Sequence, residues 1–470
     1  MLTNYKKNAD MLCFVLMKHF RIVCVVQILM VCSLIEAQVT EPDTLVVAMV
    51  PTDFNTLIYS QNRSIELGIE DESFNSDFFH RDAFSGNWWG VRNSMSESGV
   101  DFELVYKGEM FSNVSGGVEK GTTSLDNIDL IFSADLEKSL GLNAATFTLQ
   151  FLGTSGGVPN DYAGTSQGIS NIETVSTWKI YQLLLEKKFF NEQLSLLVGL
   201  YDLNSEFDAR ESSSIFINPS HGIGPDFSQS GNNGPSIFPT TSMAVRVKYE
   251  AEAGDYFQAA LFDGIPGDPE NPYGTQIQFN KDDGLLLTAE LGFVSNIEEQ
   301  LNSKIAIGAW SYTTDFEKFS LAGNDGDILS SEKNYGFYLS MEKLLSSSSE
   351  ISERNLYGFL RIGYANENVN PNDYYFGAGL KSAGLFGGRE NDEAGLAVAY
   401  SHSSSMFRES TAVQDDEILT SYEFNIEATY TFSITPWLII QPDIQYIINP
   451  SYYPQLESAL VLGSRMQLTF

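Results

Sequence analysis

Few residues of this 470-residue chain could carry out catalysis or hold a cofactor. Beyond residue 37 the histidines are far apart and lack the spacing of metal ligands: His80, His221 and His402. Ser220 directly precedes His221, but no GxSxG nucleophile turn supports this pair. The glycine-rich segments 230–234 and 384–388 lack the lysine context of a phosphate-binding loop. The sequence therefore predicts a protein that is not an enzyme and uses no cofactor or metal.

Polar residues suited to a different chemistry lie near the C-terminus, in PWLIIQPDIQYIINP (436–450). Gln441, Asp443 and Gln445 alternate with apolar residues, as on a strand with one polar and one apolar face. Their amides and carboxylate supply donors and acceptors for a channel that passes neutral polar solutes. Pro442 stands among them without an N–H for a sheet ladder. We therefore expect a bulge or a broken strand pair beside Pro442.

The elements that carry such residues are strands, because alternation with a period of two begins at Val100 and recurs to the end of the chain. Clear examples are VDFELVY (100–106) and SYEFNIEATYTF (421–432). The pattern predicts sixteen strands, at 100–112, 126–137, 145–152, 177–188, 195–203, 241–250, 255–263, 284–293, 304–313, 334–343, 356–365, 374–382, 394–401, 419–432, 437–448 and 458–470. A short helix is expected before them in 84–99, with Asn87 as N-cap and Gly99 as its end.

Two all-β architectures fit alternating strands: a soluble sandwich and a membrane barrel. Sixteen sandwich strands would usually divide into two domains, but no Pro/Ser-rich linker separates them. Aromatic residues near predicted strand ends suit the interfacial girdles of a barrel: Tyr106, Trp178, Tyr181, Tyr249, Trp310, Tyr312, Tyr335, Tyr364, Trp437 and Tyr446. The chain also ends on an alternating strand whose last residue is Phe470, like the assembly signal of outer-membrane barrels. We therefore predict an antiparallel up-and-down transmembrane β-barrel of sixteen strands.

The N-terminal 37 residues have the character of a secretory signal peptide. Lys18 and Arg21 precede the apolar run 22–34, and Ala37 ends a plausible cleavage site. Met17 could itself start a compact signal. All three cysteines of the chain lie in this leader, at positions 13, 24 and 32. The exported protein would therefore contain neither a disulfide nor a thiol.

Net charge excludes one class of partner. Without the four basic and two acidic residues of the leader, 23 basic and 59 acidic residues remain. Such a chain will not bind nucleic acid through its phosphates, which requires a basic surface. Acidic residues are expected in exposed loops or along a polar lumen. Segment 38–83 is a polar, acidic extension for which no fold is predicted.

The connections between the predicted strands are unequal in length. Short ones such as 252–255 suit the periplasmic side, and long polar ones such as 263–283 and 401–419 suit the outside. Segment 204–240 is too long for a hairpin and mixes four phenylalanines with prolines. We expect this loop to pack, by folding into the barrel.

Several segments together resemble the carbohydrate-selective porin family, the OprB-type outer-membrane porins, over residues 84–470. They are GNWWGVR (86–92), LVGLYDLNSEFD (197–208), DYFQAALFDGIPGDP (255–269) and SAGLFGGRENDEAGLAVAY (382–400). The C-terminal segment is the most specific, with Trp437, Gln441, Pro442, Asp443, Gln445, Tyr446 and Pro450 in the family's spacing.

The resemblance implies a sixteen-stranded barrel that passes small sugars by diffusion through an eyelet of charged side chains. Candidates on the long loop are Glu206, Asp208 and Arg210, and candidates on the wall are Arg246, Lys248 and Arg361. Gln441, Asp443 and Gln445 are candidate channel-lining residues. For each charged residue, a structural salt bridge between loop and wall is the competing interpretation.

The favoured function is thus a passive porin for small carbohydrates in a Gram-negative outer membrane. The alternatives are a barrel adhesin or structural surface protein, and a general non-selective porin. The expected partners are small sugars, outer-membrane lipid and the barrel-assembly machinery, the last through Phe470. A homotrimer follows only by analogy with other porins.

Overall fold

The computed structural model describes residues 78–280, 282–297, 300–319, 330–348 and 354–470. The predicted signal peptide 1–37 and most of the predicted extension 38–83 lie outside these residues. In the described part of the chain, no helix has the length and apolar character needed to cross a membrane.

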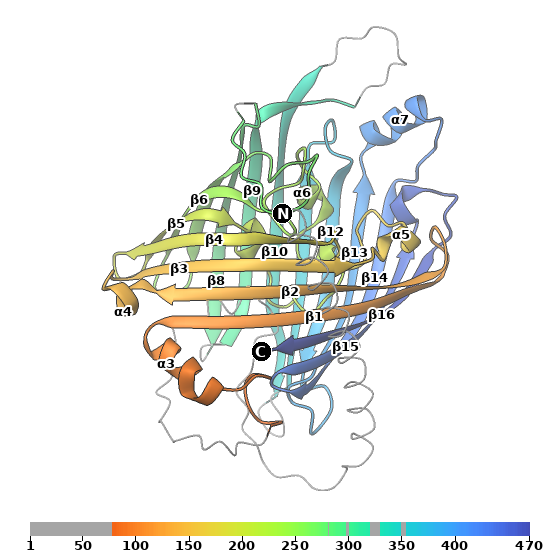
Figure 1. Ribbon diagram of the computed structural model, residues 1–470. Helices are drawn as coiled ribbons and strands as arrows, with labels where there is room; N and C mark the ends of the chain where they lie inside the picture. Colours follow the sequence, from red (N-terminus) through yellow and green to blue (C-terminus); the bar gives the residue numbers. More distant parts are fainter. Residues whose placement is uncertain (1–77, 281, 298–299, 320–329, 349–353) are drawn as a thin grey trace, which may run out of the picture. The chain divides into compact units, whose positions relative to one another are not determined.

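Sixteen strands form one closed antiparallel barrel (Figure 1). Each strand pairs with its neighbours in sequence, and β1 closes the barrel against β16, with Val105 opposite Thr469. The predicted sixteen-stranded fold is therefore confirmed. The strands are β1 (Val100–Ser115), β2 (Gly121–Asp135), β3 (Ala145–Gly156), β4 (Thr177–Phe189), β5 (Leu194–Tyr201), β6 (Ser242–Glu250), β7 (Tyr256–Asp263), β8 (Leu285–Ile297), β9 (Gln300–Glu317), β10 (Ser331–Ser348), β11 (Arg354–Ala365), β12 (Asn372–Ala383), β13 (Glu393–Ser403), β14 (Tyr422–Thr435), β15 (Leu438–Ile448) and β16 (Ala459–Thr469).

Helices are short and lie between strands. The helix predicted before β1 is present as a 3-10 turn, Trp88–Gly90, followed by α3 (Val91–Glu97), and Gly99 ends it at φ 84°. Asn87 precedes the 3-10 turn, and its Oδ1 accepts the N–H of Asn93. The other helices were not predicted: α4 (Leu136–Leu140), α5 (Asn160–Ala163), α6 (Pro225–Ser228) and α7 (Ser405–Gln414).

The alternation of each strand separates an inner polar face from an outer apolar one. On β14, Glu423 and Glu427 are completely buried inside, whereas the outward Tyr422 is 37% exposed. Outward aromatic side chains gather at both ends of the barrel, as in membrane barrels. At the end with long connections they include Trp178, Phe337, Tyr374, Tyr422 and Tyr446. At the end with short turns they include Phe189, Phe190, Tyr249, Phe257, Phe293 and Phe432.

Part of the predicted aromatic girdle is wrong. Tyr181, Trp310 and Tyr312 are almost fully buried and lie inside the barrel rather than on its outer surface. Trp310 stacks on Phe227 of the loop after β5, with ring centroids 4.8 Å apart. A loop packed inside a barrel gives the inner wall an apolar surface to bury, so apolar residues there no longer indicate the lipid-facing side.

The strand pairing beside Pro442 is broken as expected. On one side β15 pairs with β16 without interruption, with Pro442 opposite Ser464. On the other side the ladder with β14 passes from Thr429–Asp443 to Phe432–Ile440 and skips the residues between them. The Thr429 hydroxyl donates to the Pro442 carbonyl at 3.0 Å and accepts from Gln441 Nε2 at 2.9 Å. Where the ladder with β14 is interrupted, a side-chain hydroxyl thus bonds the Pro442 carbonyl.

Candidate channel constriction

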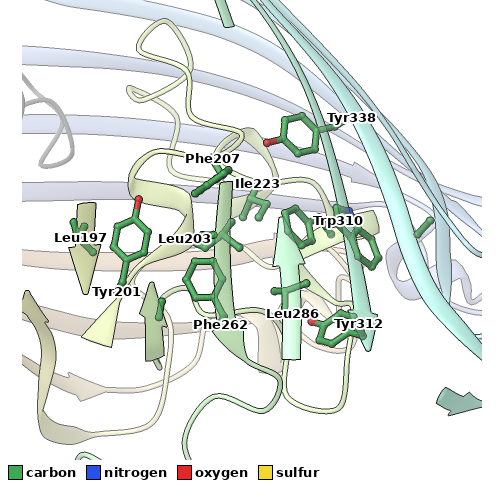
Figure 2. Packing of buried hydrophobic residues seen from close by; sticks show 14 of the residues in the cluster. Leu197, Tyr201, Leu203, Phe207, Ile223, Phe262, Leu286, Trp310, Tyr312 and Tyr338 are labelled. Carbon is green, nitrogen blue, oxygen red and sulfur yellow. The ribbon is translucent and has the colours of Figure 1, made fainter. Parts of the chain in front are cut away.

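Residues 202–241, which we term the long lumen loop, fold into the barrel as the sequence predicted. Leu203, Phe207 and Ile223 of this loop pack with wall residues of β5, β7, β8, β9 and β10 in one buried cluster (Figure 2). Phe207 and Leu203 are fully buried there. The loop therefore has an apolar core of its own, shared with the inner wall.

The first charged contact joins the loop to β6. Arg246 is fully buried, and its guanidinium donates to Glu206 through Nε at 2.7 Å and Nη2 at 3.1 Å. Nη2 also lies 3.1 Å from Glu186 of β4. The Tyr201 hydroxyl donates to Glu206 as well. Two predicted residues, Glu206 and Arg246, therefore form one buried ion pair.

The second charged contact joins the loop to β11. Arg361 donates through Nε to Asp208 at 3.0 Å and pairs with Asp226 of α6. Arg210 pairs with the same Asp208 at 2.6 Å and also donates to the carbonyls of His221 and Gly222. All four side chains have almost no exposed surface. The predicted Asp208, Arg210 and Arg361 are thus brought together by this contact.

Wall glutamates form a third kind of contact, with the loop's backbone. Glu290 on β8 accepts the N–H of Asp208 at 2.9 Å, and Glu342 on β10 accepts that of Ser212 at 2.7 Å. Glu427 on β14 accepts the N–H groups of Ile217 and Asn218 at 2.6 and 3.0 Å. These contacts follow the loop around the inner wall from β8 to β14.

The polar residues of the C-terminal segment also meet the inserted loops. Gln441 Nε2 donates to the Ile215 carbonyl at 2.6 Å. Gln445 Nε2 donates to the carbonyl of Ile169, in the loop between β3 and β4, and to Asp443. The side chains of Gln441, Asp443 and Gln445 are all buried.

Lys248 lies nearer the short-turn end of β6 than Arg246 does. Its ammonium lies 3.0 Å from Glu250 and 5.1 Å from the ring centre of Tyr256, near the short-turn end of β6.

Residues 157–176, which we term the short lumen loop, enter the barrel beside the long one. Glu423 of β14 accepts the N–H groups of Ser166 and Gln167 at 2.8 and 3.0 Å. The Ser170 hydroxyl donates to Glu109 of β1, which also pairs with Arg465 of β16. The loops meet directly, since the Asn171 N–H donates to the Ile217 carbonyl at 2.9 Å.

His221 lies inside the barrel between these contacts. Its ring is 4.8 Å from that of Phe216, and Nε2 is 3.6 Å from Glu427. Burial, and secondly the charge of Arg210, lower the pKa of His221 to about 3, so the ring is neutral. Its neighbour Ser220 donates its backbone N–H to Asn218 Oδ1.

A family model supplies the identification. Residues 119–470, most of the chain, match the model described as "Carbohydrate-selective porin, OprB family". The chain belongs to the OprB family. The predicted resemblance is therefore confirmed, and membership in a porin family implies a channel in the outer membrane rather than an enzyme.

Individual OprB relatives agree with this assignment. Porin B of Pseudomonas aeruginosa is 27% identical over 419 residues, which cover 82% of this chain and 90% of that protein. The "Putative porin QuiX" of Acinetobacter baylyi is 21% identical over 84% of this chain and 95% of its own. The high-pH structure of Pseudomonas putida OprB superimposes with a TM-score of 0.73 at 21% identity. It covers 84% of this chain and the whole of that one, so the two share the fold.

Several residues of this OprB-type lumen were missed by sequence reasoning. Glu290, Glu342, Glu423 and Glu427 hold the loops by their backbone, and Glu109 pairs with Arg465. Their one available signal was an inward register on a strand. Many carboxylates share that register, so it does not tell which ones meet a loop.

Proposed function

We propose that this protein is an OprB-type porin through which small sugars diffuse passively, with the long lumen loop setting the width of the path. One observation carries the proposal: charged pairs at Arg246 on β6 and Arg361 on β11 fix the loop to two separate parts of the inner wall. A neutral polyol needs hydrogen-bonding partners along its path without binding too tightly to leave. A rigid loop in a polar lumen meets both needs.

The charged residues act in this proposal chiefly as a frame. Glu206, Asp208, Arg210, Arg246 and Arg361 face one another and are buried, so they define the loop's position more than they touch the solute. Lumen side chains that retain exposure are better placed to meet a sugar. Lys107 of β1 keeps 19% of its side-chain surface, and Glu186 of β4 keeps 17%.

The proposal is tested by liposome swelling with a panel of sugars and amino acids, and by conductance in planar bilayers. We expect faster swelling with monosaccharides than with amino acids of similar size, and a conductance reduced by added sugar. Arg210→Ala should change ion selectivity and weaken the block by sugar. Equal swelling rates for all solutes would instead indicate a non-selective porin, and an absence of conductance would favour an adhesin or structural barrel.

The remaining features of the proposal concern export and assembly. We expect residues 1–37 to be removed as a signal peptide and the barrel-assembly machinery to use the strand that ends at Phe470. Outer-membrane lipid would surround the apolar outer face. A homotrimer is expected by analogy with other porins, and crosslinking in native membranes would test it.

A further inference from the structure

An exposed tryptophan lies in a tight turn just before the barrel begins. Trp88, Trp89 and Gly90 all have positive φ, at 50°, 57° and 90°. Such angles are unfavourable for residues with a side chain, and two successive ones persist only where surrounding contacts hold them. The turn directs the two indoles differently: Trp89 is 84% exposed, whereas Trp88 is held against the barrel.

Trp88 fixes the turn to the outer surface of β1. Its ring lies 5.5 Å from that of Phe102, and its Nε1 donates to the Ser85 hydroxyl at 2.9 Å. Phe102 points outward, because it alternates with the inward Val105 and Glu109. The Arg92 guanidinium lies over the Trp88 ring, 5.2 Å from its centre.

Arg92 also ties the segment to the seam where the barrel closes. Next to the last ladder pair, Val105 with Thr469, the Phe470 N–H donates to the Leu104 carbonyl at 2.9 Å. Arg92 Nη2 lies beside this contact and donates to the carbonyl of Phe102 at 3.0 Å and to that of Phe470 at 2.7 Å. The Phe84 ring packs 5.2 Å from the Phe470 ring. The segment is thus held at a fixed height on the barrel.

The segment lies at the same height as the girdle of outward aromatic side chains at the short-turn end of the barrel. Short turns face the periplasm in barrels of this class, so this girdle marks the interface of the inner leaflet. Phe79, 54% exposed, and Val91, 52% exposed, lie in the same segment as Trp89. An exposed indole continuous with a lipid-facing surface suits the headgroup region, where its ring is buried in the acyl boundary and its N–H stays hydrated.

We propose that the segment Phe78–Glu97 is an interfacial membrane anchor, in which Trp89 inserts among the phospholipid headgroups of the periplasmic leaflet. Figure 1 shows α3 beside the start of β1, at the end of the barrel where the short turns lie. The anchor would hold Arg92 over the seam between β1 and β16. It does not depend on which solute the channel passes.

Tryptophan fluorescence in proteoliposomes tests the anchor. The protein for this test is the full chain with the substitution Trp178→Phe. This substitution removes the other strongly exposed tryptophan, which lies at the opposite end of the barrel. Phosphatidylcholines brominated near the headgroup or near the acyl-chain end serve as quenchers from the lipid, and iodide serves as the quencher from water. We expect shallow bromines to quench this protein most strongly. Adding Trp89→Phe should remove most of that quenching.

Two outcomes would overturn the proposal. Strong quenching of Trp89 by iodide with none by brominated lipid would place it in periplasmic water. Resistance to both quenchers would show that protein covers it. Trp88→Phe in the same background is the matched control, since Trp88 lies against Phe102 and Arg92. Its removal should leave the shallow quenching largely intact, and the characteristic gel shift of folded barrels on heating reports that each variant has folded.

Discussion

The two lumen loops enter the same barrel but are held by different interactions. The long lumen loop is fixed by buried ion pairs, such as Arg361 with Asp208 at 2.9 Å, and by an aromatic core. The short lumen loop is held by hydrogen bonds, with Glu423 accepting two of its backbone N–H groups, and by apolar packing of Ile169 and Ile172. Removing one partner of a buried ion pair leaves an uncompensated charge, whereas a weakened hydrogen bond costs less. The long loop should therefore be the rigid one, and the short loop the adjustable one.

The contacts between the loops limit this difference. The Asn218 side chain donates to the Gly168 carbonyl at 2.9 Å, and Gln229 donates to the Ser166 carbonyl at 2.6 Å. Gln445 touches both loops, since it donates to Ile169 and accepts from Asn218. A change in the short loop is thus transmitted to the long loop through neutral hydrogen bonds and through the buried apolar cluster that Ile169 and Ile172 share with Ile217.

The largest effect is expected from Arg361→Met, which removes the cation shared by Asp208 and Asp226. The buried Asp226 then loses the cation it pairs with, and Asp208 keeps Arg210, at a cost of about 3–5 kcal/mol. The long loop should leave its position, so single-channel conductance should rise and the block by sugar should weaken. Planar-bilayer recordings with and without sugar measure both changes.

Arg389→Met is the matched control for this substitution. Arg389 pairs with Asp392 near the short-turn end, and its side chain is 40% exposed. The pair lies in the turn between β12 and β13 rather than in a lumen loop, so conductance should stay at the native value. If Arg361→Met behaved like Arg389→Met, the ion pairs would not fix the long loop.

A smaller effect is expected from Glu423→Gln, which weakens the short loop. The amide presents one acceptor where the carboxylate has two, so at least one N–H of Ser166 or Gln167 loses its partner, at about 1.5–3 kcal/mol. Hydrogen exchange should accelerate in residues 157–176 and hardly change around Asp208. Equal acceleration in both loops would mean that they move as one unit.

Acid should loosen the long loop by a still smaller amount. The pKa of His221 is lowered to about 3 in the folded protein from a usual value near 6.5. A depressed histidine pKa stabilises the fold above 6.5, and that stability is lost as pH falls below it. Lowering pH from 7.5 to 5.5 should cost the long loop about 1 kcal/mol. His221→Phe should reduce the acid-induced loss of protection, measured as exchange rates divided by the intrinsic rate at each pH, and an unchanged loss would implicate other groups.

The short loop should respond to pH in the opposite direction. Burial raises the pKa of Glu173 to about 7, although backbone N–H groups, that of Asn160 among them, oppose the shift. A raised carboxyl pKa stabilises the fold below its unfolded value near 4.5, and that stability is lost as pH rises through 7. Protection from hydrogen exchange in residues 157–176, corrected for the intrinsic rate at each pH, should therefore rise on acidification, and Glu173→Gln should abolish the rise.

The barrel itself was predictable because strand alternation is a local property of the sequence. In β14 and β15 each polar residue assigned to the lumen, such as Glu427 and Gln441, does lie inside. The inward folding of residues 204–240 was also predictable, since their phenylalanines needed burial. Arg246 and Arg361 could be named because the family resemblance implies an eyelet of charged side chains and both residues fall on an inward register.

The partners of these residues were not predictable. Arg361 and Asp208 are far apart in sequence, and only the path of the loop brings them together. Trp310 was assigned to the outer surface because the sequence does not show that Phe227 lies inside the barrel and stacks on it. The wall glutamates were missed for the same reason. The contacts of a loop depend on its three-dimensional path, and no periodicity in the sequence predicts that path.

The smallest effect is expected at Pro442, which tests whether the broken pair matters to the loops at all. Pro442→Val would supply an N–H that could bond to β14, a gain of at most about 1 kcal/mol. A restored ladder would also offer a β14 N–H to the carbonyl of residue 442, in competition with the Thr429 hydroxyl, which donates to this carbonyl and accepts from Gln441. If the ladder wins, Gln441 is released from Thr429 but keeps the Ile215 carbonyl of the long loop. Unfolding in denaturant should then show a slight stabilisation with unchanged conductance, whereas a changed conductance would mean that the break helps to position the loop.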